Sequence, residues 1–189
     1  MDKTELRKLA KQKLLGIKGA QKKKLSLELS RNIKDFLPSL SSKTDILKSG
    51  LIGGFSPLED ELDWHLGLAE TGLHPCVPSI GVNGEMEFHK VGWKLLSKEF
   101  LGLKLAHGFP LVKPELIIVP GLAFSPKGQR LGRGRGYYDR YLAKHPAFKI
   151  GVCSEEQIFE NITIEAHDIL MSVVITDKNI YRRGNKDEY

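Results

Sequence analysis

Apolar positions along the chain follow two periods, and the change from one period to the other predicts its elements. From residue 3 to 17 and from 21 to 37, leucine and isoleucine recur every three or four positions among lysines, which predicts two amphipathic helices. Short apolar runs rich in β-branched residues favour buried strands, the last of them at 173–176. These runs lie at 51–56, 74–79, 116–119, 149–153 and 173–176.

Further helices are expected between the strands. One covers 61–71, where Gly72 would follow the helix as its left-handed terminal residue, and another covers 137–144. A β-hairpin is predicted at Asn83 and Gly84, the pair that favours a tight turn between two strands. Strands alternating with helices predict an α/β fold with a largely parallel sheet covered on both faces. The length of 189 residues favours a single domain, residues 1–189.

Glycine and arginine alternate between the 116–119 strand and the 137–144 helix. Glycine allows positive φ and close backbone approach, so that successive N–H groups can face an anion. The helix that follows would add its positive end, and Arg130, Arg133 and Arg135 offer forked donors that match phosphate oxygens. The loop matches neither a P-loop nor a GxGxxG fingerprint. The pattern favours a phosphate site, and a flexible RNA-binding segment is the alternative.

Asp139 lies in the first turn of the helix after this loop. A carboxylate beside a polyphosphate is repelled unless a cation lies between them, and Mg²⁺ commonly binds one or two carboxylates together with phosphates. Asp139 is therefore a candidate Mg²⁺ ligand. An ion pair with a neighbouring arginine, or compensation of the helix dipole, would account equally for a carboxylate at this position.

The formal net charge of +6 favours anionic partners such as a nucleotide, a polyglutamate tail or nucleic acid. Cys76 and Cys153 lie far apart without metal-ligand spacing, which indicates neither a disulfide framework nor a zinc site. No secretory signal and no apolar run of membrane-spanning length is present in the sequence. We therefore expect a cytoplasmic protein with no membrane partner.

Two motifs in this region resemble the signature of a known family. They are Pro-Gly-Leu-Ala-Phe at 120–124 and Arg-Leu-Gly-Arg-Gly-Arg-Gly-Tyr-Tyr-Asp-Arg-Tyr-Leu at 130–142. Together they are similar to the signature of the 5-formyltetrahydrofolate cyclo-ligases, also called methenyltetrahydrofolate synthetases. The resemblance covers nearly the whole chain and implies a three-layer α/β/α fold. It also implies ATP-dependent conversion of 5-formyltetrahydrofolate to 5,10-methenyltetrahydrofolate, with release of ADP and phosphate through an iminium phosphate.

The resemblance also assigns residues to ATP. Relatives carry a Lys-x-x-x-Arg pair near the N-terminus that contacts ATP, and Lys3 and Arg7 fall on it; otherwise a basic helix face is usually only solvated. Arg133 and Arg135 are the candidates for stabilising charge on the moving phosphoryl group, although relatives often have lysine at the position of Arg135. The expected ATP-binding residues are Lys3, Arg7, Arg130, Gly132, Arg133, Gly134, Arg135, Gly136, Tyr137 and Tyr138.

For the folate, the resemblance places Glu61 on the pterin ring, with Phe55, Ser56 and Tyr137 lining the same pocket. From the residues alone, Glu61 is as well explained as part of an acidic first turn, and the tyrosine pair as ordinary core.

For Mg²⁺, the resemblance pairs Asp139 with Asp168, while a later aspartate of relatives is Ser172 here. We expect a monomer that acts on folate and ATP and binds no nucleic acid. A nucleic-acid-binding module and a non-catalytic folate- or nucleotide-binding relative are the alternatives.

Overall fold

The computed structural model describes residues 2–41, 45–96 and 108–183, and within them one mixed sheet has eight strands. The strand order is β10-β9-β8-β5-β1-β2-β3-β4. The five strands from β9 to β2 are mutually parallel. At one edge β10 pairs antiparallel with β9, and at the other β3 pairs antiparallel with β2 and β4 antiparallel with β3. The strands are β1 Leu51–Gly53, β2 His74–Ile80, β3 Met86–Lys90, β4 Leu111–Val112, β5 Leu116–Pro120, β8 Phe148–Val152, β9 Val173–Ile175 and β10 Ile180–Arg182.

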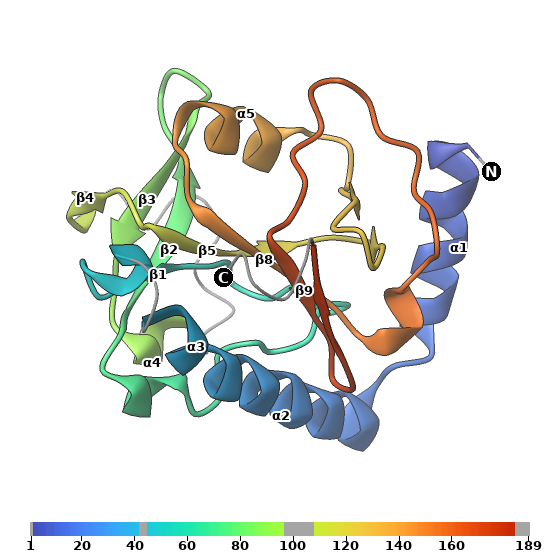
Figure 1. Ribbon diagram of the computed structural model, residues 1–189, viewed down its shortest axis with the longest axis horizontal. Coiled ribbons are helices and arrows are strands. Elements are labelled where there is room, and N and C mark those ends of the chain that lie inside the picture. The colour runs from blue at the N-terminus through green and yellow to red at the C-terminus, as the bar shows by residue number, and fades with distance from the viewer. Residues whose placement is uncertain (1, 42–44, 97–107, 184–189) are drawn as a thin grey trace.

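Helices cover both faces of the sheet, as expected for three layers. Helix α2 lies on one side and α5 on the other (Figure 1). Phe36 of α2 stacks on Phe148 of β8, and Tyr141 of α5 meets Phe88 of β3 edge to face. The helices are α1 Lys3–Leu15, α2 Gly19–Phe36, α3 Pro38–Ser41, α4 Trp93–Leu96 and α5 Tyr137–Lys144, with 3-10 turns η1 Asp45–Leu47, η2 Leu68–Thr71 and η4 Glu155–Gln157.

The apolar run of strand β5 is uninterrupted because both of its faces are buried. Leu116 and Ile118 belong to the core on the α2 side, whereas Ile117 and Val119 belong to the core on the α5 side. All four side chains are fully buried. A strand covered on both faces cannot alternate with polar residues, so the predicted buried strand is confirmed.

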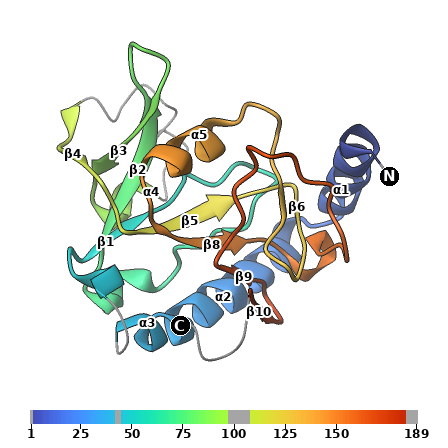
Figure 2. The ribbon, with the colours of Figure 1, turned by 45° about the horizontal axis from the view of Figure 1, so that its top comes forward.

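Helix α1 begins at a capping box. The Asp2 carboxylate accepts from the N–H groups of Thr4 and Glu5, and the Glu5 carboxylate accepts from the Asp2 N–H. Its buried stripe comprises Leu6, Ala10 and Leu14. The helix packs beside η4, and the arrow of β5 points toward it (Figure 2). The carboxyl end of the sheet, where open α/β folds bind ligands, is therefore bordered by α1.

The helix predicted over 61–71 is wrong. In place of a helix the chain runs through extended and turn conformations to the single turn η2, and only the left-handed Gly72, at φ 76°, matches the expectation. Ser26 and Ser30 of α2 bond to the backbone of this segment, with Ser30 Oγ donating to the Asp63 carbonyl at 2.9 Å. These contacts between segments replace the hydrogen bonds of a helix.

The hairpin at Asn83 and Gly84 is confirmed, because β2 and β3 pair antiparallel on either side of this turn and Gly84 has φ 76°. Several features were not predicted, including short elements such as α4 and β4 and the following two. The strand at 173–176 is not the last, since β10 follows it at the sheet edge. A second, two-stranded hairpin, β6 Ala123–Phe124 with β7 Arg130–Leu131, lies within the segment predicted as a loop.

Candidate functional site

A cavity of about 700 Å³ opens among the carboxyl ends of β1 and β5, the N-terminal turns of α1, and the loop before α5. Its lining unites residues that are up to 165 positions apart in sequence. Every residue that the sequence assigned to ATP, folate, metal or catalysis lines it. These residues are Lys3, Arg7, Phe55, Ser56, Glu61, Arg130, Gly132, Arg133, Gly134, Arg135, Gly136, Tyr137, Tyr138, Asp139 and Asp168.

Helix α1 contributes two cations to the cavity. The ammonium of Lys3 lies 2.7 Å from a carboxylate oxygen of Asp168 and 3.0 Å from one of Glu165. Burial lowers the pKa of Lys3, but the bonds to these two carboxylates outweigh burial and the net shift is upward. One turn later, Arg7 donates from Nε to the carbonyl of Gly132 at 3.2 Å. Both cations therefore reach from α1 to loops that follow the sheet strands.

The loop between β7 and α5 presents backbone donors. Gly134 and Gly136 have φ of 98° and 64°, conformations that side chains rarely adopt. The backbone N–H groups of residues 133–136 donate to no acceptor in the described part of the chain. Consecutive free N–H groups at the start of a helix form an anion site. The geometry is the one that the glycine and arginine pattern predicts.

Arg130 and Asp139 form a shielded ion pair at the base of this loop. Arg130 Nη2 lies 2.5 Å from Asp139 Oδ2, and their side chains are 7% and 14% exposed. Asp139 also accepts from the Ile169 N–H at 3.3 Å, which ties α5 to the segment that carries Asp168. Within the described residues, the buried Nε of Arg130 and hydroxyl of Tyr138 have no hydrogen-bond partner. Two buried polar groups beside the cavity are thus left for a ligand to satisfy.

Arg133 crosses from the glycine-rich loop to the loop after β1. Its Nη2 lies 2.6 Å from Asp60 Oδ1 and 3.3 Å from Glu61 Oε1. Glu61 also accepts from the Leu58 N–H at 3.0 Å. Burial raises the pKa of Glu61, and the bond from Leu58 and the charge of Arg133 oppose that rise only in part. The residues predicted for the folate and for the phosphoryl group are in direct contact.

The other side of the cavity is apolar. Its lining includes Phe55 from the loop after β1, Val77 and Ile80 of β2, and Met86 of β3. The fully buried Trp64 donates from Nε1 to the carbonyl of Phe55 at 2.9 Å, which fixes the backbone at the end of β1. A flat apolar wall beside a buried carboxylate suits a heteroaromatic ligand with N–H donors on one edge.

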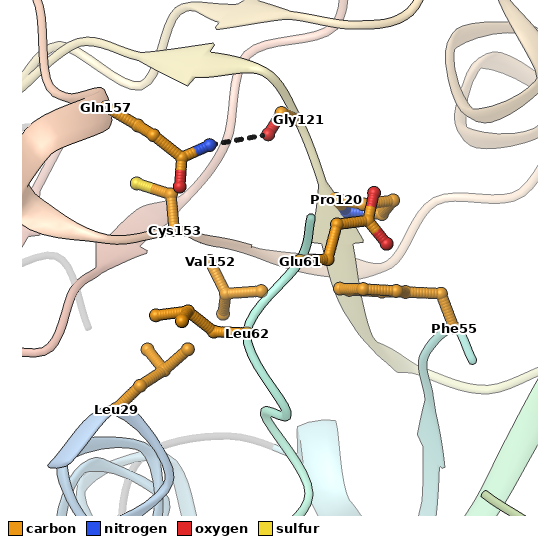
Figure 3. Close-up of a pocket in the computed structure, with 9 residues that line it drawn as sticks. All are labelled: Leu29, Phe55, Glu61, Leu62, Pro120, Gly121, Val152, Cys153 and Gln157. Carbon is orange, nitrogen blue, oxygen red and sulfur yellow. Dashed lines mark hydrogen bonds between the residues drawn. The ribbon is translucent and has the colours of Figure 1, made fainter. Parts of the chain in front are cut away.

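A second, smaller cavity of about 10 Å³ lies behind the first. Glu61 and Phe55 face it from the loop after β1, and Gln157 of η4 donates to the Gly121 carbonyl at 3.1 Å across it (Figure 3). This volume is at the lower limit for one water molecule. Glu61 therefore lies between a large cavity and a small one, and burial is the largest influence on its pKa.

The candidate metal ligands of the cavity are two carboxylates, those of Asp139 and Asp168. The described residues hold no group of three or more His, Cys, Asp or Glu side chains placed for a metal. Asp139 and Asp168 line the same cavity and are joined through Ile169, and each is paired with a cation. Two carboxylates are enough for Mg²⁺ when phosphate oxygens and water complete its shell. The donor chemistry fits Mg²⁺ held jointly with a polyphosphate.

Two acidic residues of the site were not predicted as functional. Asp60 was assigned to a helix turn that does not form, and it pairs with Arg133 instead. Glu165 received no role, and it shares Lys3 with Asp168. Asp60 could have been found from its position beside Glu61, whereas nothing local marks Glu165.

Comparisons with known proteins agree with this arrangement. Residues 83–177 match the model of the 5-formyltetrahydrofolate cyclo-ligase family. The chain belongs to this family. The matched segment contains Asn83 and Gly84 of the β2–β3 turn, β5, the glycine-rich loop, α5, β8, β9 and Asp168, so the loop part of the phosphate side of the cavity falls within it. Glu61, Lys3 and Arg7 lie outside the matched residues.

Two relatives illustrate the likeness in sequence. A probable 5-formyltetrahydrofolate cyclo-ligase of Schizosaccharomyces pombe is 40% identical over 81 residues, 36% of this chain and 40% of that protein. The 5-formyltetrahydrofolate cyclo-ligase of Escherichia coli strain K12 is 35% identical over 75 residues, 38% and 41% of the two chains. The matched stretches therefore span less than half of either relative.

Solved structures extend the likeness over the full length. The 5,10-methenyltetrahydrofolate synthetase of Aquifex aeolicus has a TM-score of 0.76 and 30% identity, covering 100% of this chain and 97% of the other. A synthetase from Mycoplasma pneumoniae, at 21% identity, shares the fold with a TM-score of 0.71 over 94% and 100% of the chains. The predicted α/β fold is confirmed. No helix in the described part of the chain has the length and apolar character of a membrane span.

Proposed function

We propose that this cyclo-ligase family member converts 5-formyltetrahydrofolate to 5,10-methenyltetrahydrofolate with ATP, releasing ADP and phosphate. The observation that carries the proposal is the single cavity with two chemically different ends. One end has free backbone N–H groups and cations, and the other has an apolar wall with the buried Glu61. A polyphosphate and a pterin each fit one end, and the reacting atoms would meet between them.

The need for ATP follows from the substrate's chemistry. The oxygen of the N5-formyl group is a poor leaving group, so N10 cannot displace it directly. The formyl oxygen attacks the γ-phosphorus, the bond to the bridging oxygen breaks, and ADP leaves with that electron pair. N10 then attacks the carbon of the resulting iminium phosphate. The C–O bond breaks, and the N10 proton leaves with the phosphate as hydrogen phosphate while the ring closes.

Phosphoryl transfer of this kind needs positioning and charge compensation more than a protein nucleophile. In the proposed complex, Arg133 and Arg135 stabilise the developing charge on the transferred group. Lys3, Arg7 and Arg130 hold the phosphate chain, with the N–H groups of residues 133–136 as further donors. Glu61 accepts N–H bonds from the pterin, and Phe55 and Tyr137 pack on the ring. The described structure supports these roles by placing all of these residues on one cavity.

Asp139 and Asp168 are the residues suited to hold Mg²⁺ with the phosphates. The ion supplies neutralisation of phosphate charge when bound. Until then, Arg130 and Lys3 hold the two carboxylates in place at 2.5 Å and 2.7 Å. A carboxylate with a fixed orientation is better prepared for a ligand than a free one.

Turnover tests the proposal directly. Purified protein is given 5-formyltetrahydrofolate with and without MgATP, and the absorbance of the methenyl product is followed. Asp139→Ala and Arg133→Ala are measured beside the parent, with circular dichroism to show that both fold. Product that requires MgATP and falls strongly in both variants is the expected result.

Well-folded parent protein that forms no product at saturating substrate would overturn the proposal. Direct titrations then separate the remaining possibilities. Binding of folate or ATP without turnover would indicate a non-catalytic relative. Salt-sensitive RNA binding that Asp139→Ala leaves intact would indicate a nucleic-acid-binding protein.

A further inference from the structure

The guanidinium of Arg140 reaches back over the N-terminal end of α5. Side chains of an α-helix lean toward its N-terminus, which brings this one to the glycine-rich loop. Its Nη1 donates to the carbonyl of Arg135 at 3.0 Å, and its central carbon lies 5.2 Å from the centre of the Tyr137 ring. A Cβ on Gly136 would lie 2.9 Å from the same Nη1. Arg140 therefore covers three consecutive residues where the loop becomes the helix.

The bond to the Arg135 carbonyl fixes one particular peptide. That carbonyl and the N–H of Gly136 belong to the same planar trans unit, so they point in opposite directions. The Gly136 N–H donates to no acceptor in the described residues, and Gly136 lines the cavity. If this peptide turned over, a carbonyl oxygen would take the place of an N–H donor. An anion would then meet a repulsive group.

Among the described residues, no side chain caps the first-turn N–H groups of α5. Its N-cap is Gly136, which has no side chain to accept from the first-turn N–H groups. A serine or aspartate N-cap would accept hydrogen bonds from the first-turn N–H groups. Here Arg140 holds the junction instead by donating to the carbonyl of Arg135. Arg140 is exposed to solvent, so this role does not come from core packing.

We infer that Arg140 is a positioning residue, which keeps the Gly136 N–H directed at the phosphate chain of the nucleotide. The inference rests on the proposed function, because it concerns the same phosphate site. Arg140 does not line the cavity, and its hydrogen bond at this junction goes to the backbone. Its loss should therefore weaken nucleotide binding more than folate binding, which it can affect only through the Tyr137 ring.

The test compares Arg140→Ala and Arg140→Lys with a matched control. Arg182→Ala removes another exposed arginine that lies 5.4 Å from an aromatic ring, that of Phe36, and does not line the cavity. ATP binding is measured by calorimetry without folate, and KM and kcat by product absorbance. Arg140→Ala should weaken ATP binding and raise the KM for ATP by roughly tenfold, with a smaller change in the folate KM. Arg140→Lys keeps a donor and should recover part of the loss, and Arg182→Ala should match the parent.

The ¹⁵N amide resonance of Gly136 in the ligand-free protein gives a readout that does not depend on turnover. It should shift in Arg140→Ala, return toward the parent position in Arg140→Lys, and stay in place in Arg182→Ala. An unshifted resonance, or unchanged ATP affinity in Arg140→Ala, overturns the inference. If the parent binds no ATP, the proposed function fails, and the amide resonance alone decides the peptide orientation.

Discussion

Replacing Glu61 with glutamine should weaken folate binding and, at neutral pH, stabilise the ligand-free protein. The side chain is 12% exposed and lies between the large cavity and the small one. Glutamine has nearly the same shape and keeps an oxygen for the Leu58 N–H, 3.0 Å away in the parent. Arg133 keeps Asp60 as a partner at 2.6 Å. The substitution therefore removes one buried charge and leaves the other contacts in place.

The loss of binding follows from hydrogen-bond counting. In the proposed complex the carboxylate accepts two N–H bonds from the pterin edge. Glutamine offers one acceptor oxygen, and its NH₂ group would lie opposite an N–H donor of the pterin. A charge-assisted bond contributes about 1.5–3 kcal/mol, which corresponds to a rise in folate KM of roughly 10- to 100-fold. The KM for ATP should stay close to that of the parent.

The gain in stability has a definite pH dependence. Burial raises the pKa of Glu61 above its ordinary value of 4.5. Because the pKa is higher in the folded state, folding favours the protonated group, and the stability that this group contributes is fully present below pH 4.5. That stability is lost as the pH rises through the folded-state pKa. Glutamine does not titrate, so Glu61→Gln should become more stable than the parent as the pH rises toward neutrality.

Urea unfolding from below pH 4.5 to neutral pH measures this difference, and steady-state kinetics measure the KM. Glu59→Gln is the control, because it makes the same change in charge at an exposed position two residues away. The reasoning is refuted if the two glutamine variants show the same pH dependence. An unchanged folate KM in Glu61→Gln would independently remove this residue from the proposed folate site.

Two further substitutions test other parts of the structure. Lys3→Met should weaken ATP binding by roughly tenfold in calorimetry, because one charged donor is lost; an unchanged affinity would mean that Lys3 only ties α1 to Asp168. Gly151→Ala should destabilise the fold by about 1–3 kcal/mol in urea unfolding, because the new Cβ would lie 2.5 Å from the Phe124 ring. Gly92→Ala, with nothing within 4 Å, is its control, and equal midpoints for both would contradict the packing.

The fold was predictable where local pattern and tertiary environment agree. Strand β5 is buried on both faces, so its apolar run indicated a strand without information from distant residues. The helix predicted over 61–71 does not form, because the backbone of this segment is hydrogen-bonded to serines of α2. The local sequence pattern contains no sign of these contacts. The edge strand β10 is three residues long and has one half-buried side chain, Tyr181, so its apolar signal is weak.

The site was predictable where its residues are contiguous. Glycines and neighbouring arginines between a strand and a helix already favour a phosphate site. The partners of those cations were not predictable, because Asp60 and Glu165 come from separate loops and meet Arg133 and Lys3 only in the folded chain. Asp139 shows the limit most clearly: the arginine pair weighed as an alternative is present, and the metal role stays a prediction.

The pairing of charges also bears on how a polyphosphate could be accommodated. Three of the predicted phosphate-binding cations, Lys3, Arg130 and Arg133, are each held by at least one carboxylate. These pairs keep like-charged cations together in one cavity and fix their orientation before a ligand arrives. They also cancel most of the attraction that a polyphosphate would feel, because it must compete with carboxylates already in place. A divalent cation bound between Asp139, Asp168 and the phosphates would restore the balance, which favours entry of nucleotide and Mg²⁺ together over entry of free nucleotide.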